Sequence, residues 1–405
     1  MTVAGVRLPL WLLVVAGCLI AILSNGVRSS FGLFLDSMTV ERGWSYNVLP
    51  FALAIQNLLW GLSQPVAGAI ADRFGAGRVI AGGAVIYAAG VWLMAHSSSP
   101  LEITLTAGFM IGAGMGAASF AIVIAAIVKM VDESKRSVVM GIGTAAASMG
   151  QFVMLPLGQT FITTYGWQTA LVILALLVAM IVPLASALRT GPAVMAGPAQ
   201  SIGEALREAA GHRGYVLLTV GFFVCGFHVA FITVHLPKYL TDVGIDAANA
   251  AWALAIVGLA NIVGSFSSGV LGGRYSKKTM LAAIYFLRAV VIAALILAPK
   301  SLFTIYLFAG AMGLLWLSTV PLTSGIVAQV FGPRYMATLV GIVFFSHQIG
   351  SFMGVWLGGV IRESTGSYDM MWWLGVLMGV LATLIHLPID EKPLARLSAR
   401  APAQA

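Results

Sequence analysis

Long apolar segments follow one another along almost the whole of this 405-residue chain. A helix of about 20 apolar residues crosses the hydrocarbon core of a bilayer, and only helices and closed barrels satisfy their backbone polar groups there. Apolar residues make up 60% of the chain and charged residues only 9%, which leaves no room for a soluble catalytic domain. We therefore predict an all-α membrane protein that is not an enzyme.

Turn residues and charges divide the sequence into twelve predicted transmembrane spans. These cover residues 8–36, 45–71, 78–97, 101–129, 137–164, 167–188, 214–240, 247–272, 278–298, 301–329, 337–362 and 368–388. The more polar stretch between spans six and seven suggests a boundary. We predict an N-terminal six-helix bundle over 1–188, a cytoplasmic linker over 189–213, a C-terminal six-helix bundle over 214–390 and a cytoplasmic tail over 391–405.

Basic residues are concentrated on one side of this topology. With both termini inside, 16 of the 22 lysines and arginines fall in cytoplasmic segments and four in outer loops, while Arg28 and Arg288 lie inside spans. This positive-inside asymmetry predicts a multi-pass protein with cytoplasmic termini, expected in a bacterial inner (plasma) membrane. The net charge of +8 then needs no nucleic acid to explain it. Neither cysteines nor acidic residues show a catalytic or metal-ligating pattern, so we expect no cofactor and no metal.

The chain also repeats itself at an offset of 200 or 201 residues. A segment after span two, Gly68-Ala-Ile-Ala-Asp72-Arg73-Phe-Gly75-Ala-Gly-Arg78, has a counterpart after span eight, Gly269-Val-Leu-Gly-Gly-Arg274. Glycines in span five and directly after it recur in the same way: Gly141, Gly150, Gly158 and Gly166 return as Gly341, Gly350, Gly358 and Gly366. Parallel repeats of this kind predict two pseudo-symmetric halves, with a solute site between them near the membrane midplane.

The segment from Gly68 to Arg78 resembles the signature loop of the major facilitator superfamily, and the resemblance extends over both halves. It implies twelve transmembrane helices in two pseudo-symmetric six-helix bundles and transport by alternating access. In that family the charged residues of the loop lock the cytoplasmic face; the alternative is a topological anchor. The implied cytoplasmic gate comprises Gly68, Asp72, Arg73, Gly75, Arg78 and, in the second copy, Arg274. Gly273 replaces the aspartate in that copy, so a charge lock there is weaker or differently paired.

Within the superfamily, several segments look like the monocarboxylate porter and oxalate/formate antiporter group. They are Arg28 with Phe31-Gly-Leu-Phe34, Lys135-Arg136-Ser-Val-Val-Met-Gly141, Gly150-Gln151, Pro156-Leu-Gly-Gln159 and Gly166-Trp167. Monocarboxylate porters carry a lysine in helix one that engages the substrate carboxylate, and Arg28 aligns with it. They also carry an aspartate and an arginine in helix eight, where this chain has Asn261 and Ser265. That departure leaves substrate identity and proton coupling open.

Arg28 and Arg288 are cations without a carboxylate at membrane depth, because all fourteen acidic residues fall in loops or at span ends. An arginine at this depth costs roughly 3 kcal/mol on insertion scales and normally serves a polar cavity or a partner. Its planar fork suits a carboxylate, so we expect Arg28 to bind an organic anion. The alternative is that Arg28 snorkels outward from a helix end. Helix nine lies at the periphery in the superfamily that this chain resembles, so Arg288 either contacts substrate, caps a carbonyl or binds a neighbouring helix.

Other polar and aromatic residues complete the predicted site. His228 occupies the place in the second half that Arg28 occupies in the first, and an imidazole can change charge near neutral pH. We predict His228, and after it His347, as proton-coupling residues; a purely structural histidine is the alternative. The full set of substrate-binding candidates is Arg28, Asn25, Gln151, His228, Asn261, Arg288, Trp316 and His347.

We therefore predict a secondary active transporter of a small organic anion, with a monocarboxylate as the expected type and proton symport as one mode. Its expected partners are the anion, protons and the lipid bilayer, and a monomer is expected. One alternative is an exporter of amphipathic or neutral compounds, including drugs, in which Arg28 is structural. The other is a non-transporting membrane sensor.

Overall fold

The computed structural model describes residues 2–3, 6–7, 10–119, 122–123, 126, 133–188, 202–332 and 336–394. Nearly all of this is helix; the exception among the described elements is a short antiparallel pair of strands, β1 (Thr2–Val3) and β2 (Val6–Arg7). Within the described residues, nine helices are long and apolar enough to cross a membrane. The all-α class predicted from the sequence is confirmed.

The N-terminal group of helices covers the first six predicted spans. Span one is α1 (Leu10–Ser30), the 3-10 turn η1 (Phe31–Phe34) and α2 (Leu35–Arg42), and spans two and three are α3 (Val48–Phe74) and α4 (Ala76–His96). Span four begins with α5 (Pro100–Ile103), the π-helix η2 (Thr104–Met110) and α6 (Ile111–Ala117). Spans five and six are α8 (Glu133–Tyr165), then α9 (Trp167–Ala179), α10 (Ile181–Ala185) and η3 (Ser186–Leu188).

The C-terminal group covers the last six predicted spans. It contains α12 (Arg213–Asp242), α13 (Ala247–Leu271), α14 (Lys277–Leu297), α15 (Leu302–Leu315), α16 (Thr319–Phe331), α17 (Met336–Thr365) and α18 (Asp369–His386). A separate helix, α11 (Ile202–Gly211), lies in the predicted linker. The tenth span was expected as one helix, but it is broken between α15 and α16. The bundle and linker boundaries drawn from the sequence stay predictions.

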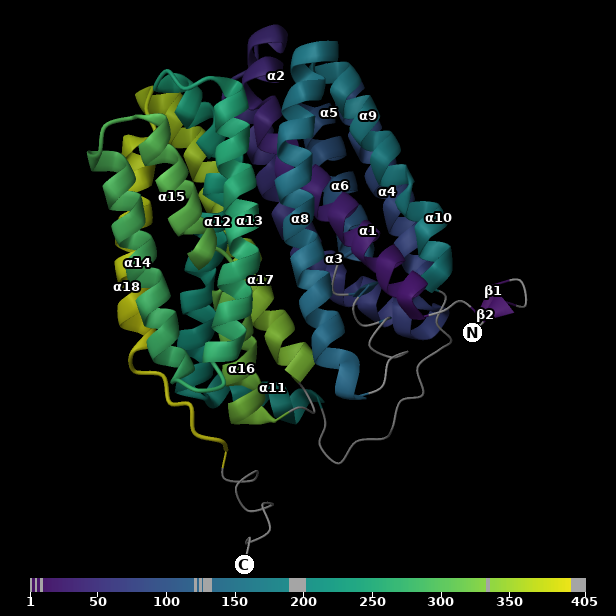
Figure 1. The fold of residues 1–405 in the computed structure, drawn as a ribbon, viewed down its shortest axis with the longest axis vertical. Coiled ribbons are helices and arrows are strands. Elements are labelled where there is room, and N and C mark those ends of the chain that lie inside the picture. The colour runs from purple at the N-terminus through teal and green to yellow at the C-terminus, as the bar shows by residue number, and fades with distance from the viewer. Residues whose placement is uncertain are drawn as a thin grey trace, which may run out of the picture.

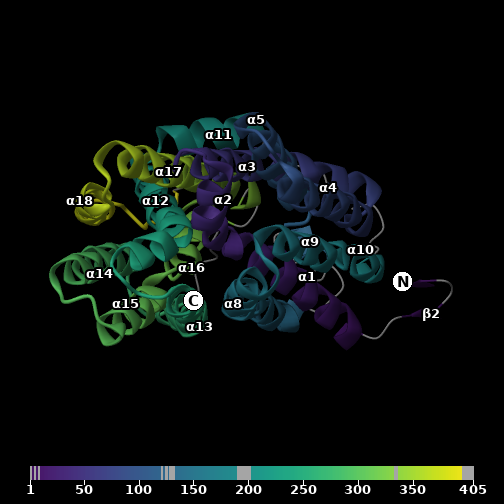
Figure 2. The same ribbon diagram turned by 90° about the horizontal axis from the view of Figure 1, so that it is seen from above.

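The two groups lie side by side with their helices running roughly along the same direction (Figures 1 and 2). They meet where α8 packs against α13, α3 packs against α17, and α12 packs against η1 and α2. One end of the molecule carries β1, β2 and the last turn of α18, and α2 lies at the other end (Figure 1). We call these the inner and the outer end, following the predicted topology.

Backbone geometry supports the internal repeat that the sequence suggested. Gly43 and Gly244, 201 residues apart, both have positive φ angles, of 65° and 88°, and each lies just beyond a helix end. Gly166 and Gly366, 200 residues apart, have φ angles of 79° and 73°. A left-handed backbone at a helix end strongly favours glycine. The repeated glycines therefore mark the same turns in both groups.

The closest helix contacts are also repeated. A Cβ atom at Gly26 of α1 would lie 2.6 Å from the Gly150 carbonyl oxygen of α8. In the C-terminal group, a Cβ atom at Gly226 of α12 would lie 1.8 Å from the His347 carbonyl oxygen of α17. Small residues let helix backbones approach each other this closely in membranes. The pairs α1–α8 and α12–α17 are therefore equivalent, closely packed helix pairs, one in each group.

We predict that Gly226→Ala destabilises the protein by about 1–3 kcal/mol, the usual cost of overpacking, because its new methyl group meets backbone that cannot move aside freely. Gly310→Ala, on α15, is the matched control, since a Cβ atom there has nothing within 4 Å. That control should be neutral or stabilise the helix by up to about 1 kcal/mol. Thermal unfolding in detergent measures both. Equal melting temperatures for the two variants would contradict the close contact.

Candidate functional site

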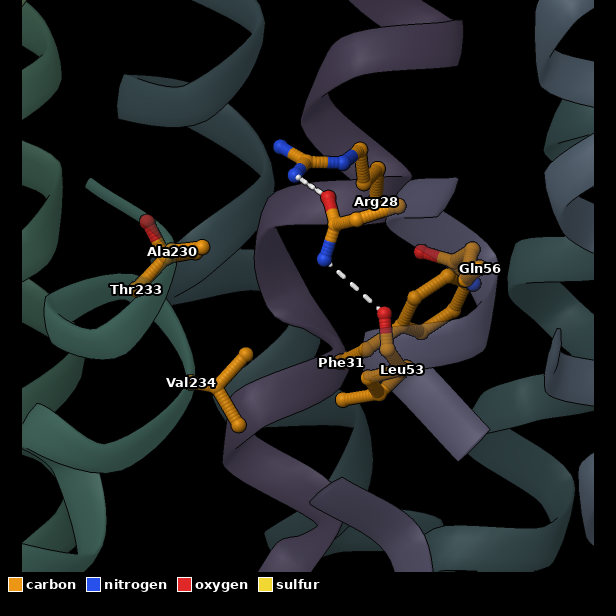
Figure 3. A pocket seen from close by; sticks show the side chains of 8 residues that line it. Arg28, Phe31, Leu53, Gln56, Ala230, Thr233 and Val234 are labelled. Atoms are coloured by element: carbon orange, nitrogen blue, oxygen red, sulfur yellow. Dashed lines mark hydrogen bonds between the residues drawn. The ribbon is translucent and has the colours of Figure 1, made fainter. Parts of the chain in front are cut away.

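A small cavity lies where the two groups of helices meet. One wall comes from α1, η1 and α3, and the other comes from α12 (Figure 3). The lining residues are Arg28, Phe31, Leu53, Gln56 and Asn57 from the N-terminal group, and Ala230, Thr233 and Val234 from the C-terminal group. The cavity thus combines a cation, a few hydrogen-bonding groups and apolar walls.

The end of α1 places Arg28 at this cavity. Two residues beyond Arg28 the α-helix gives way to the tighter turn η1, and the Ser30 hydroxyl donates to the Val27 carbonyl at 2.7 Å. Gly32, inside η1, lies directly against α12: a Cβ atom there would be 2.6 Å from the Thr233 carbonyl oxygen. Because only glycine allows this approach, η1 and α12 can close around the cavity.

The guanidinium group of Arg28, on α1, contacts two residues of α3. Its Nη2 donates to the Asn57 Oδ1 at 2.7 Å, and its Cζ lies 4.7 Å from the centre of the Trp60 ring. Asn57 in turn donates from Nδ2 to the Leu53 carbonyl at 2.9 Å, and both bonds are drawn in Figure 3. The Arg28 Nε is buried and has no hydrogen-bond partner among the described residues. Arg28 is therefore held in place but keeps a free donor.

Neutral groups surround Arg28 in this part of the structure. The ion pairs found among the described residues join Lys238 or Arg362 to Asp36 and Asp242, all near the outer end. Two other polar side chains of the cavity are bonded to backbone carbonyls: Gln56 Nε2 donates to Ala107 at 2.8 Å, and the Thr233 hydroxyl donates to Val229 at 2.7 Å. Within the described residues, the positive charge of Arg28 thus has no paired acidic side chain.

Three predicted site residues connect helices instead of lining this cavity. Asn25 Nδ2 donates to the Ala147 carbonyl of α8 at 2.8 Å, within the N-terminal group. Gln151 Nε2 donates to the Leu254 carbonyl at 3.1 Å, and Asn261 Nδ2 donates to the Ser148 hydroxyl at 2.9 Å. The last two bonds cross between α8 and α13. They lie at the interface of the groups, as expected, but their amide donors are occupied by protein.

His228 was predicted as a site residue from its equivalent place in the repeat, but it does not lie with Arg28 at the cavity. Its Nε2 is 2.8 Å from the Gly375 carbonyl oxygen of α18, and the ring is buried inside the C-terminal group. At 100° per residue, Ala230 and Val234 point to the other side of α12. Those residues, and not His228, line the cavity with Arg28.

Arg288 binds backbone at the break in the tenth span. It is fully buried on α14, and its Nη2 donates to the Leu315 carbonyl at 2.8 Å and to the Trp316 carbonyl. These carbonyls lie at the C-terminal end of α15, where unpaired carbonyl groups carry partial negative charge. The capping alternative considered from the sequence is the one that the structure shows. Arg288 and Trp316 do not line the cavity around Arg28.

His347 is joined to the Arg28 site through aromatic rings. Its imidazole stacks on Phe344 with ring centres 5.6 Å apart and planes 10° apart. Phe344 of α17 contacts Trp60 of α3 edge to face at 5.6 Å, and Trp60 covers Arg28. The His347 Nδ1 also lies 3.2 Å from the Gln348 Oε1. Of the two histidines predicted for coupling, His347 is therefore the one connected by contacts to the cation.

The two residues that contact the Arg28 guanidinium group, Asn57 and Trp60, were not among the predicted site residues. Both stand on α3, three positions apart, so they share one face of that helix. A cation at membrane depth needs a hydrogen-bond acceptor and gains from an aromatic face. Searching the neighbouring spans for an acceptor and an aromatic residue at helical spacing would have suggested this pair.

The residues of the predicted cytoplasmic gate lie near the junction of α3 and α4 and, for Arg274, between α13 and α14. Gly75, with a φ angle of 92°, ends α3, and its N–H donates to the Ala71 carbonyl at 2.8 Å. Gly68 lies within α3, and the side chains of Arg73, Arg78 and Arg274 are exposed. The Asp72 side chain lies outside the described residues. A charge lock between Asp72 and these arginines therefore stays a prediction.

A polar cluster joins the two groups at the outer end. Lys238 of α12 pairs with Asp36 of α2 at 2.7 Å, and the Tyr46 hydroxyl donates to the same carboxylate at 2.9 Å. The Tyr46 N–H donates to the Glu363 Oε2 of α17 at 2.8 Å. We call Asp36, Tyr46, Lys238 and Glu363 the outer-end cluster. It holds the outer ends of the groups together and was not predicted from the sequence.

Two groups of membrane-spanning helices that meet around a cavity are the architecture of a solute transporter, and the comparisons with known proteins agree. The family model described as Major Facilitator Superfamily matches residues 17–355 and 217–405. The chain belongs to this superfamily, and its relatives and structural neighbours are transporters, not enzymes. The sequence-based expectation of the superfamily fold is confirmed.

Relatives and solved structures match along nearly the whole chain. Monocarboxylate transporter 13 of Rattus norvegicus is 25% identical over 396 residues, covering 93% of this chain and 89% of that protein. The uncharacterized MFS-type transporter YcxA of Bacillus subtilis is 24% identical and covers 95% and 97%. A crystal structure of a D-xylose-proton symporter superposes with a TM-score of 0.75 at 14% identity, covering 95% and 99%. This last likeness concerns the fold alone.

We predict that Asp36→Asn shifts the protein toward an outward-open arrangement, because the lost ion pair exists only while the outer ends touch. A partly exposed pair contributes about 0.2–1 kcal/mol, so the ratio of the two states should change up to about fivefold. Distances between spin labels at the outer ends of α2 and α18 measure the shift. Asp246→Asn is the matched control, since Asp246 caps α13 within one group. Identical distance distributions for Asp36→Asn and wild type would rule out this role.

Proposed function

We propose that this protein is a secondary active transporter of a small organic anion that carries a single carboxylate. The observation that supports this most directly is Arg28, a cation in the cavity between the two groups without a paired acidic side chain in the described structure. A site of fixed positive charge between two groups that move relative to each other suits a negatively charged cargo.

The hydrogen bonding around Arg28 supports a carboxylate in particular. Two buried N–H donors, Arg28 Nε and Trp60 Nε1, lack acceptors among the described residues, and Arg28 itself contacts the Trp60 ring. An unsatisfied buried donor costs about 1–3 kcal/mol. A carboxylate brings two acceptor oxygens and forms charge-assisted bonds, which are the strong ones. Binding such an anion would satisfy the Arg28 donor and neutralise its charge together.

The surroundings of Arg28 limit the size and charge of the proposed substrate. The second mid-membrane arginine, Arg288, is bound to backbone carbonyls elsewhere, so the cavity offers one cation and favours one negative charge. Phe31, Leu53 and Val234 provide apolar walls that suit a short hydrocarbon portion. Relatives named monocarboxylate transporters align over about nine-tenths of the chain and support the same substrate class.

The remaining features of the proposal concern how and where transport takes place. Transport by alternating access would open the outer-end cluster in one step and the predicted cytoplasmic gate in the other. We propose a bacterial inner-membrane location with both termini in the cytoplasm, on the basis of the positive-inside asymmetry. We also propose that the monomer is the transporting unit, since the cavity draws its lining from both groups of one chain.

We predict that Arg28→Gln weakens binding of propionate, lactate or pyruvate about 30-fold or more, because removing one charged partner of a desolvated pair costs about 2–5 kcal/mol. Arg28→Lys keeps the charge but loses the fork and should retain part of the affinity. Titration of the purified protein, followed by calorimetry or thermal shift, measures these values. Uptake into proteoliposomes shows whether binding leads to transport.

Arg288→Gln provides the control. It should lower thermal stability, because it uncaps the end of α15, while the folded fraction binds carboxylates as wild type does. Wild-type affinity in Arg28→Gln would remove the basis of the proposed function. Preferential binding of neutral or cationic compounds by the wild type would favour the exporter alternative instead.

We further propose that transport is coupled to protons through a histidine, and the contacts support His347 over His228. The groups that face His347 are Phe222 at a ring distance of 5.1 Å, Phe344, Gln348, Ser351 and the Cys225 thiol. His347 is the titratable group connected through Phe344 and Trp60 to Arg28. We propose that anion binding at Arg28 and proton binding at His347 are linked through these contacts.

An inward proton gradient should accelerate carboxylate uptake by the wild type. His347→Gln should lose that acceleration and still exchange labelled for unlabelled substrate, whereas His228→Gln should keep the acceleration. Proteoliposome uptake at matched internal and external pH separates the gradient from the pH itself. If the proton gradient does not change uptake by the wild type, proton coupling is excluded, and transport occurs by facilitated diffusion or anion exchange.

A further inference from the structure

We propose that Asn57 and Trp60 are positioning residues that hold Arg28 in the cavity while leaving its charge and most of its donors available to the substrate. The inference rests on the proposed function, because it concerns how the proposed anion site is prepared. Both residues lie on α3, and both contact the guanidinium group. Neither carries a charge that would compete with a substrate.

The orientation of Asn57 is fixed by its second hydrogen bond. Its Nδ2 donates to the Leu53 carbonyl at 2.9 Å, so the amide oxygen is the end that faces Arg28, at 2.7 Å. The side chain is buried, with 2% of its surface exposed. A flipped amide would place two donors against each other and leave the Leu53 carbonyl without this partner. Asn57 therefore presents only its acceptor oxygen to Arg28.

The amide group of Asn57 supports the buried cation without competing with a substrate carboxylate. A buried cation needs an acceptor, and the amide oxygen supplies one without cancelling the positive charge. An aspartate at the same place would form an ion pair, whose hydrogen bonds are roughly twice as strong as neutral ones. A substrate carboxylate would then have to displace a carboxylate of the protein. The amide avoids this competition.

Trp60 supports Arg28 without using its donors. A guanidinium group has five N–H donors, and a cation held over an aromatic face is attracted by the ring and keeps its edges free. With the Cζ 4.7 Å from the ring centre, Trp60 covers Arg28 while Asn57 accepts from one nitrogen. The unpaired Arg28 Nε is consistent with an edge left open for an acceptor.

Trp60 also ties the position of Arg28 to the contact between the two groups. Its ring meets Phe344 of α17 edge to face, and a Cβ atom at the next residue, Gly61, would lie 2.8 Å from the Gln348 Cγ. This α3–α17 contact belongs to the surface along which the groups would move during alternating access. Movement of α17 away from α3 would therefore change the support of Trp60 and, through it, the alignment of Arg28.

The test compares binding of propionate and of its neutral analogue propionamide to the full-length protein in detergent. Asn57→Asp has nearly the shape of the native side chain but supplies a competing carboxylate, so propionate affinity should fall about 30-fold or more. Asn57→Ala removes the acceptor and should cost less, on the order of 3- to 10-fold. Gln64→Glu is the matched control: it adds the same charge to α3 at a half-buried position away from the cavity. That variant should bind propionate as wild type does.

The tryptophan is tested by a second pair of variants. Trp60→Phe keeps an aromatic face and should bind propionate within about threefold of wild type. Trp60→Leu loses the face and should bind about 3- to 10-fold more weakly, within the range of cation–π contributions. Melting temperatures of the two variants should match each other. The difference then reports on Arg28 and not on general packing, and propionamide binding should be unaffected.

Several outcomes would overturn the inference. Asn57→Asp that binds propionate like wild type would show that Asn57 does not set the charge at Arg28. Equal propionate affinities for Trp60→Phe and Trp60→Leu would show that the aromatic face of Trp60 does not position Arg28. If Arg28→Gln abolishes binding while these variants bind normally, the positioning role fails and the proposed function stands. If Arg28→Gln binds normally, the proposed function fails first.

Discussion

The structure depends on how one guanidinium group is accommodated between two groups of apolar helices. Arg28 has no paired acidic side chain in the described structure; an amide oxygen at 2.7 Å and a tryptophan face support it instead. Neutral contacts of this kind hold a cation without neutralising it. The cavity that results carries a positive charge between the two groups of helices, and the anion-binding proposal follows from that charge.

Arg288 shows what the same side chain does in a structural role. It is fully buried and donates to carbonyls at the C-terminal end of α15, so its charge stabilises a break in a helix. The two arginines look alike in the sequence, as isolated cations within apolar spans. They differ in which face of which helix they occupy and in whether backbone carbonyls are within reach. The comparison explains why one cation lines a cavity and the other is bound to backbone.

The fold could be predicted from the sequence. Each long apolar segment must be a helix in lipid, and the repeat at an offset of about 200 residues indicates two pseudo-symmetric halves. The sequence also singled out Arg28, which lines the cavity between the two groups. It placed His228 on the wrong side of α12, because equivalent positions in a repeat need not face the same way. It did not show the break after Leu315, the Asn57–Trp60 support or the outer-end cluster. Each of these depends on contacts between helices that are distant in the sequence, which an isolated pattern cannot reveal.

The most direct measurement is an experimental structure of the protein with a short monocarboxylate bound, since it asks where the anion sits. The account predicts that the carboxylate oxygens lie within about 2.7–3.2 Å of Arg28 nitrogens, with Asn57 and Trp60 still in contact with the guanidinium group and the hydrocarbon portion against Phe31, Leu53 or Val234. A carboxylate bound away from Arg28, with the cavity occupied only by solvent, would contradict it.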